Sequence, residues 1–112
     1  MLGDVPDLLE VLAEPHRRRI LDALRAGESS VGALVEVLGS SQPLVSKHLR
    51  VLREAGLVDV RVDGQRRLYR VRPEPLLELD AWLEPYRQMW RTSLDRLEAH
   101  LTEGDPPCVK RP

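Results

Sequence analysis

Residues 39–60 read GSSQPLVSKHLRVLREAGLVDV, and this stretch is the most informative part of the sequence. Ser40 or Ser41 can cap a helix that carries Pro43 in its first turn and that Gly56 closes. Projection at 100° per residue gives the helix, expected from Ser41 to Ala55, two opposite faces. The polar and mostly basic face holds Gln42, Pro43, Ser46, Lys47, Arg50, Arg53 and Glu54, and the apolar face holds Leu44, Val45, Leu49, Val51, Leu52 and Ala55. Such a helix suits a DNA major groove, although this pattern alone also fits an ordinary solvated helix.

The hydrophobic period changes to two after this helix. Val58, Val60 and Val62 alternate with polar residues, which predicts a strand. Asp63-Gly64 is the expected two-residue hairpin turn, and a return strand is expected over residues 65–72. The arginines near the tip are Arg61, Arg66, Arg67 and Arg70. Long cationic side chains around a tight turn suit contact with phosphate or the minor groove, so a basic hairpin is predicted beside the helix. The alternative for Arg67 is an inward position beside Tyr69.

Three short helices are expected before residue 40. Helical spacing of leucines and isoleucine predicts them over residues 5–12, 15–26 and 31–38. Gly27 and Gly39 are expected to end the second and third helices. The order is therefore helices first, a hairpin next, and further helices at the C-terminal end.

The C-terminal part carries a narrow apolar stripe. Pro85 is expected to divide it into a short helix over residues 76–82 and a long one over residues 85–101. The stripe consists of Leu83, Tyr86, Trp90, Leu94, Leu97 and Leu101, which fall within an arc of about 80°. A stripe this narrow is typical of a coiled-coil seam and predicts a dimer interface. Residues 1–101 are expected to form one domain, and residues 102–112 a disordered tail.

Composition and charge narrow the functional classes. The 112-residue chain has a net charge of −1, but residues 42–72 carry eight Lys and Arg against three acids. A basic middle between acidic flanks indicates one surface that faces a polyanion. Cys108 is the single cysteine, and neither a membrane span nor a signal peptide is expected, so we expect a cytoplasmic protein. No Ser/His/Asp set, glycine-rich phosphate loop or paired-carboxylate site has local support, so we expect no enzyme.

Four segments together resemble the ArsR/SmtB family of winged helix-turn-helix repressors. They are LAEPHRRRIL at residues 12–21, QPLVSKHL at 42–49, LREAGLV at 52–58 and GQRRLY at 64–69. The resemblance implies a mainly α fold with a two-stranded β-hairpin wing and added terminal dimerisation helices. It also implies a homodimeric repressor that occludes a palindromic double-stranded DNA operator. By the match, the recognition-helix contacts are Ser41, Gln42, Pro43, Ser46, Lys47 and Arg50, and the wing contacts are Arg66 and Arg67.

Many members of the family sense metals, yet we expect neither a metal nor a cofactor here. Their sensors use paired cysteines before the recognition helix or acids and histidines on the last helix. Residues 35–38 contain no cysteine. On the last helix Asp95, Glu98 and His100 could supply donors, but Asp95 and Glu98 have the spacing of ordinary surface residues. No His/Asp/Glu set is expected to converge. The segment at residues 79–87 is similar to a branch without a recognised metal site.

Several basic residues have two interpretations. His48 lies on the apolar face and is expected to be packed and hydrogen-bonded, and His16 to serve the start of its own helix. Arg17, Arg18 and Arg19 either approach DNA phosphate or pair with acids of their own helix.

Two alternatives to simple repression stay open. DNA binding could be controlled by an unknown effector, a metal or small molecule at the dimer interface. The chain could instead be a winged-helix module that binds protein.

Overall fold

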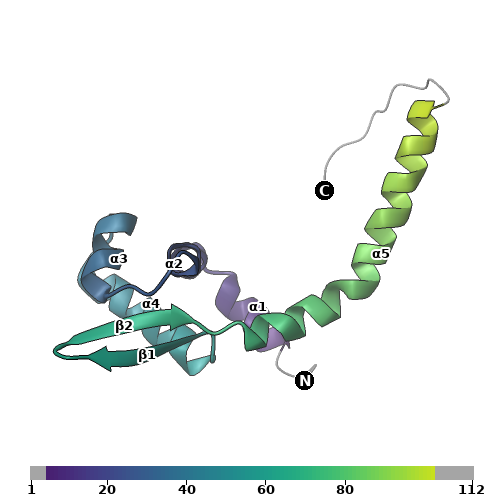
Figure 1. Cartoon of the computed structure of the whole chain (residues 1–112). Helices are drawn as coiled ribbons and strands as arrows, with labels where there is room; N and C mark the ends of the chain where they lie inside the picture. Colours follow the sequence, from purple (N-terminus) through teal and green to yellow (C-terminus); the bar gives the residue numbers. More distant parts are fainter. Residues whose placement is uncertain (1–4, 103–112) are drawn as a thin grey trace. The chain divides into compact units, whose positions relative to one another are not determined.

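The computed structural model describes residues 5–102, in which five helices and one hairpin follow one another (Figure 1). The elements are α1 (Val5–Leu12), α2 (Pro15–Arg25), α3 (Val31–Leu38), α4 (Gln42–Glu54), β1 (Val58–Asp63), β2 (Arg66–Val71) and α5 (Glu74–Thr102). The expected mainly α architecture with a two-stranded hairpin is confirmed. The first four helices begin and end within one residue of the predicted bounds. Cys108 and most of the predicted tail, residues 103–112, lie outside the described residues.

Local signals in the sequence define the turn between α3 and α4. Ser30 caps α3, since its Oγ accepts a hydrogen bond from the Ala33 amide at 3.2 Å. Gly39 ends α3 in the left-handed conformation, with φ of 64°, which glycine adopts without strain. Ser41 caps α4 by accepting from the Leu44 amide at 3.3 Å. These three positions fix where one helix stops and the next begins.

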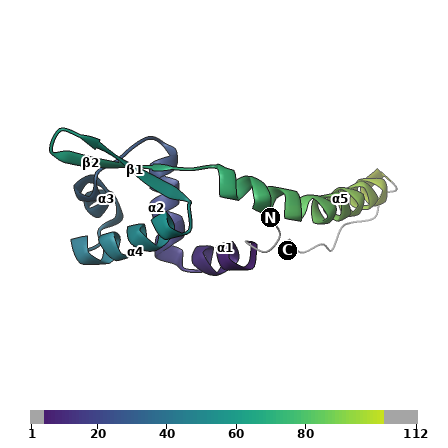
Figure 2. The ribbon, with the colours of Figure 1, turned by 90° about the horizontal axis from the view of Figure 1, so that it is seen from below.

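The described chain divides into two compact units, the first ending at Leu79 and the second beginning at Asp80. In the first unit, α2, α3 and α4 pack together beside the base of the hairpin (Figures 1 and 2). Its core consists of Leu8, Ile20, Leu24, Leu34, Val45, Leu49, Leu52, Leu57, Val58 and Tyr69. Every element from α1 to β2 contributes to this core, which holds α4 against the rest of the unit.

The hairpin is antiparallel, and its turn lies one residue later than expected. Asp63 still pairs with Arg66, so the two-residue loop is Gly64-Gln65 and not Asp63-Gly64. Gly64 has a φ of 65°, whereas no non-glycine residue of the described chain has positive φ. Positive φ at the first loop position alone is the type II′ pattern, which requires glycine there.

Burial decreases along the hairpin from base to tip. Val58 is buried and pairs with Val71, whereas Val62, on the same face, is 70% exposed and pairs with Arg67. The alternation in the sequence therefore predicts the strand correctly, but only its base belongs to the core. The tip projects into solvent.

A third segment joins the edge of the hairpin. Ser29, in the loop between α2 and α3, exchanges two backbone hydrogen bonds with Tyr69 of β2, at 3.1 and 2.8 Å. This bridge fastens the second strand to the loop that precedes α3.

Helix α5 runs unbroken through Pro85, so the predicted division into two helices is wrong. A proline removes one backbone donor but leaves the remaining hydrogen bonds of a long helix in place. Side chains also connect the turns around it, because Arg87 bonds both Asp80 and Glu84, and Arg91 bonds Glu84 at 3.2 Å. None of the described helices is both long and apolar enough to cross a lipid bilayer.

Candidate nucleic-acid interface

Helix α4 has the two faces that the sequence predicts. All seven residues of the polar face are exposed, whereas the apolar face is buried or half-buried. The fully buried positions are Val45, Leu49 and Leu52, together with His48. The apolar face therefore packs α4 against the core, and the polar face is exposed to solvent. On the polar face, amide and hydroxyl groups lie near the N-terminus and cations lie further along the helix.

The predicted contact residues of α4 differ in whether their side chains already form hydrogen bonds or ion pairs within the chain. The Ser41 hydroxyl already caps the helix, so its substitution would affect stability as well as any contact. Arg50 lies 3.6 Å from Glu54 in an exposed i,i+4 pair. Within residues 5–102, the side chains of Gln42, Ser46 and Lys47 form neither a hydrogen bond nor an ion pair with another described residue, which leaves their polar groups available to an external partner.

Two hairpin arginines are paired with acids. Arg61 donates to both carboxylate oxygens of Glu28, at 2.7 and 2.9 Å, and Arg70 donates to its cross-strand neighbour Asp59 at 2.8 Å. These hydrogen bonds hold the pKa values of Glu28 and Asp59 below their ordinary values. Arg70 therefore links the two strands, Arg61 links the hairpin to the loop before α3, and the charge of both arginines is largely balanced locally.

The two predicted wing contacts lie at the tip. Arg66 is 3.3 Å from Asp63 across the turn, in a pair whose members are at least half exposed. Arg67 is exposed and has no ion pair within the described part of the chain. Of the four hairpin arginines, Arg67 is therefore the one whose charge is fully available.

The three consecutive arginines of α2 have a role that the sequence did not indicate. Each donates to a backbone carbonyl at the C-terminal end of another helix. The bonds run from Arg17 to Val11 (3.3 Å), from Arg18 to Leu12 (2.7 Å) and from Arg19 to Leu38 (3.0 Å). Cations at these ends satisfy carbonyls that have no partner within their helix. Pairing of these arginines with acids of α2 is not seen among the described residues, and the three side chains connect α2 to α1 and α3.

His48 is packed and hydrogen-bonded, as expected. It is 5% exposed, and its Nδ1 accepts a hydrogen bond from Arg17 Nε at 3.3 Å. Its ring is stacked on that of His16, with centroids 5.4 Å apart and 8° between the planes. Burial, and then the positive charge of Arg17, lower the pKa of His48. The histidine therefore joins α4 to the start of α2.

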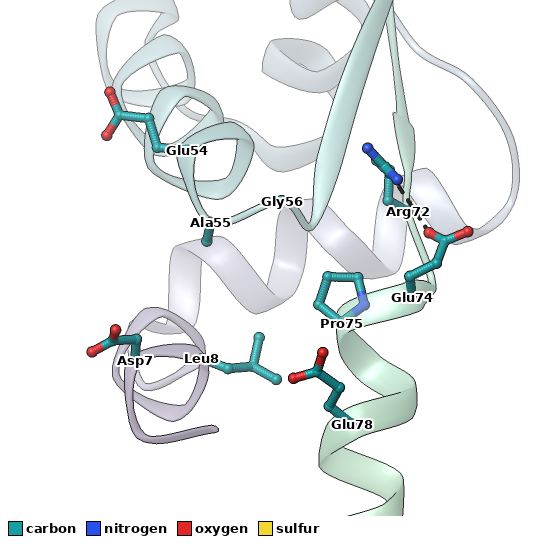
Figure 3. A pocket seen from close by; sticks show the side chains of 9 residues that line it. All are labelled: Asp7, Leu8, Glu54, Ala55, Gly56, Arg72, Glu74, Pro75 and Glu78. Carbon is teal, nitrogen blue, oxygen red and sulfur yellow. Dashed lines mark ion pairs between the residues drawn. The ribbon is translucent and has the colours of Figure 1, made fainter. Parts of the chain in front are cut away.

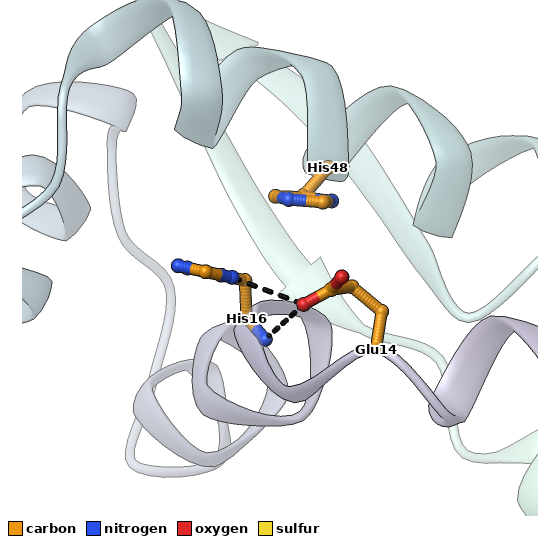
Figure 4. Close-up of side chains that lie close together, drawn as sticks. All are labelled: Glu14, His16 and His48. Carbon is orange, nitrogen blue, oxygen red and sulfur yellow. Dashed lines mark hydrogen bonds and ion pairs between the residues drawn. The ribbon is translucent and has the colours of Figure 1, made fainter.

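Glu14, His16 and His48 converge, which the sequence did not predict (Figure 4). One Glu14 oxygen accepts from the His16 amide at 2.9 Å, as the cap of α2, and lies 3.0 Å from His16 Nδ1. The His16 amide bond, the larger effect, and the ring contact lower the pKa of Glu14. The expectation that no His/Asp/Glu set converges is wrong for these three, because packing of α4 on α2 brings a distant histidine to a helix start.

A surface pocket of about 420 Å³ lies beside the C-terminal end of α4 (Figure 3). Its lining is Asp7, Leu8, Glu54, Ala55, Gly56, Arg72, Glu74, Pro75 and Glu78. Carboxylates outnumber the single cation, which lies 3.6 Å from Glu74. These nine residues include no serine, cysteine or histidine that could act as a nucleophile or base. The excess of carboxylates makes the pocket unsuited to a phosphate group.

The apolar stripe of α5 is largely uncovered within one chain. Tyr86, Trp90, Leu94 and Leu101 are exposed, whereas Leu83 and Leu97 are half-buried. Tyr86 also contacts Trp82, with ring centroids 5.1 Å apart. Large apolar side chains in such a row indicate a surface that another molecule covers.

Comparison with known proteins places this geometry among DNA-binding regulators. Residues 14–60 match the family model described as bacterial regulatory protein, arsR family. The HTH-type transcriptional regulator Rv2034 of Mycobacterium tuberculosis is 40% identical over 95 residues, which cover 85% of this chain and 78% of that protein. The biofilm growth-associated repressor of Agrobacterium fabrum is 44% identical over 68 residues, or 61% of this chain, and the match spans 58% of the repressor's own length.

A solved structure agrees with both the fold and the family. It is the homodimeric winged helix-turn-helix DNA-binding domain of a possible ArsR-family transcriptional regulator from Mycobacterium bovis. The sequences are 32% identical, the TM-score is 0.63, and the alignment covers 78% of this chain and 81% of that domain.

Proposed function

The chain belongs to the arsR family of bacterial regulatory proteins, and on this premise we propose that it is a homodimeric repressor that occludes a palindromic operator. The family consists of transcriptional regulators with a DNA-binding winged helix, and the chain is therefore not an enzyme. In this proposal the unit ending at Leu79 contacts DNA, and the rest of α5 forms the dimer. The protein acts in the cytoplasm, where it has access to the chromosome.

The exposed face of α4 is the observation that carries the proposal. Gln42 and Ser46 lie one turn apart near the helix N-terminus, where a helix docked in the major groove comes closest to the base edges. An amide can pair bidentately with adenine, and a hydroxyl can bond either kind of base. Ser41 and Pro43 flank these groups, and Lys47 and Arg50 follow at positions suited to phosphate.

The hairpin provides a second contact that does not depend on sequence. Arg67 and Arg66 lie at its exposed tip, and only Arg66 shares its charge with a neighbouring acid. Contacts between such cations and phosphate release counterions, so they add affinity for any duplex and make it depend on salt. In this proposal α4 selects the operator and the wing supports it.

Dimerisation follows from the stripe on α5. In two copies joined along Leu83, Tyr86, Trp90, Leu94, Leu97 and Leu101, these side chains would be removed from water. The homodimeric domain from Mycobacterium bovis supports this assembly by similarity. A two-fold dimer presents two recognition helices, and a palindromic operator is the matching DNA symmetry.

The decisive experiment measures affinity for a selected operator duplex and a scrambled duplex at several salt concentrations. Gln42→Ala should cost about 1–3 kcal/mol at the operator and largely spare the scrambled duplex, because a base contact carries discrimination. Gln88→Ala is the matched control, since Gln88 is an exposed amide on α5 outside the proposed contact surface. Equal losses on both duplexes for Gln42→Ala would refute base recognition by α4. Absence of any operator-sized footprint at low salt would favour a protein-binding module instead.

A further inference from the structure

The cluster of Glu14, His16 and His48 offers three metal-binding side chains outside the exposed face of α4. One ligand atom from each residue lies within 4.8 Å of the other two. Glu14 and His16 are half-buried at the start of α2, and His48 is buried on α4 (Figure 4). The cluster therefore spans two helices and is open to solvent on one side.

We propose that Glu14, His16 and His48 bind one divalent first-row metal ion, for which zinc is the best fit. Zinc binds imidazole nitrogen and carboxylate oxygen at about 2.0–2.2 Å, so donors of a tetrahedral site lie about 3.3 Å apart. Glu14 Oε1 and His16 Nδ1 are already 3.0 Å apart. Three protein donors leave the fourth position of the tetrahedron to water.

Completion of the site needs one ring to turn. The rings of His16 and His48 are stacked in nearly parallel planes, whereas the lone pairs that bind a metal lie in the plane of each ring. The His48 ring is held by burial, but the His16 side chain is 43% exposed and can rotate. The ion therefore binds to the fixed His48 and to Glu14, and His16 turns toward it.

Arg17 is the local competitor of the ion. Its Nε donates to His48 Nδ1 at 3.3 Å, and its Nη1 donates to the Val11 carbonyl at 3.3 Å. A cation beside His48 is repelled by this guanidinium, and an ion that takes Nδ1 displaces it. Removal of the positive charge at position 17 should therefore strengthen metal binding, which is the opposite of what removal of a ligand does.

The test uses the full chain without a polyhistidine tag, freed of metal by a chelator, and Co²⁺ as a spectroscopic probe. We expect one equivalent of Co²⁺ per chain, with the intense visible bands of a tetrahedral ion, which Zn²⁺ then displaces. Zn²⁺ should also raise the unfolding temperature, because an ion bound only to the folded state stabilises it. Both measurements are made without DNA, so the metal site and the proposed repressor function can fail independently.

Variants assign the ligands. His16→Gln and Glu14→Gln should each weaken Co²⁺ binding at least tenfold, about 1.4 kcal/mol. Arg17→Gln should strengthen binding. His100→Gln and Cys108→Ser remove the remaining histidine and the single cysteine and should change nothing. His16 is exposed enough for its variant to fold, which circular dichroism verifies.

Two outcomes would overturn the metal site. One is a wild-type chain that binds no Co²⁺. The other is stoichiometric binding that survives His16→Gln and disappears in His100→Gln or Cys108→Ser.

Discussion

Arg17 and His48 are 31 positions apart in the sequence, yet Arg17 Nε donates a hydrogen bond to His48 Nδ1. The same guanidinium bonds the Val11 carbonyl at the end of α1. One side chain of α2 therefore connects α1 with the buried face of α4. Helix α4 thus contacts α2 through this polar group as well as through the aliphatic core.

Removal of the Arg17 side chain should destabilise the fold. Arg17→Ala leaves a buried ring nitrogen and a helix-end carbonyl without their donor, so we expect a decrease of about 1–3 kcal/mol in the free energy of unfolding. Denaturant titration of the metal-free chain measures it. Arg25→Ala, at the exposed end of the same helix, should stay within about 0.5 kcal/mol of the wild type. Equal effects of the two substitutions would contradict the role of Arg17.

The hairpin arginines should separate into two classes. Arg67→Ala should weaken binding to operator and random duplex alike, and it should reduce the salt dependence by about 0.9 for each phosphate that the variant no longer neutralises. Arg61→Ala should affect DNA binding less, because Arg61 is committed to Glu28. Binding isotherms at several salt concentrations distinguish them. If Arg61→Ala reduced the salt slope as much as Arg67→Ala, the proposed division between the two would be wrong.

The α5 stripe should control assembly without affecting the fold of one chain. Leu94 is 61% exposed, so Leu94→Asp costs little within a chain but places a charge in the proposed seam. We expect a dimer for the wild type and a folded monomer for the variant, by sedimentation velocity and circular dichroism. Thr92→Asp, on the opposite side of the helix, should remain dimeric. A wild-type monomer that binds operator with full affinity would exclude the dimer model.

The Glu28–Arg61 pair should add stability only above acid pH. Arg61 stabilises the charged carboxylate and so lowers the pKa of Glu28 in the folded chain, while the unfolded value stays at about 4.3. The contribution is complete above the unfolded value and is lost as the pH falls through the lower folded value. Unfolding titrations from neutral to acid pH should therefore show Glu28→Gln less stable than the wild type at pH 7 and converging with it in acid. Glu36→Gln, at an exposed position in α3 without an ion pair among the described residues, should show no such convergence.

Local patterns in the sequence predict most of the fold. Serine caps, glycine stops and apolar spacing place the first four helices, because these signals act within a few residues. The exposed face of α4 follows from helical periodicity alone. The predicted turn is wrong by one residue. Both Asp63-Gly64 and Gly64-Gln65 can form a two-residue hairpin loop, and the pairing of Asp63 with Arg66 selects Gly64-Gln65.

Features that depend on tertiary proximity could not be predicted. The Arg17–Arg19 run forms bonds to the ends of two other helices, and nothing in its spacing indicates those carbonyls. The approach of His48 to Glu14 and His16 likewise depends on how α4 packs on α2. The pairing of Arg61 with Glu28 joins the hairpin to the loop between α2 and α3, and helices α3 and α4 separate the two residues in the sequence.

The bridge between Ser29 and Tyr69 sets a limit on what the wing can do. Two backbone hydrogen bonds at Ser29 and the adjacent Glu28–Arg61 pair fasten both strands to the loop before α3. Movement of the base of the wing away from the loop before α3 would require these hydrogen bonds to break. In the proposed complex, the spacing between α4 and the hairpin tip is therefore set by the protein, and a duplex that contacts both would have to match this spacing.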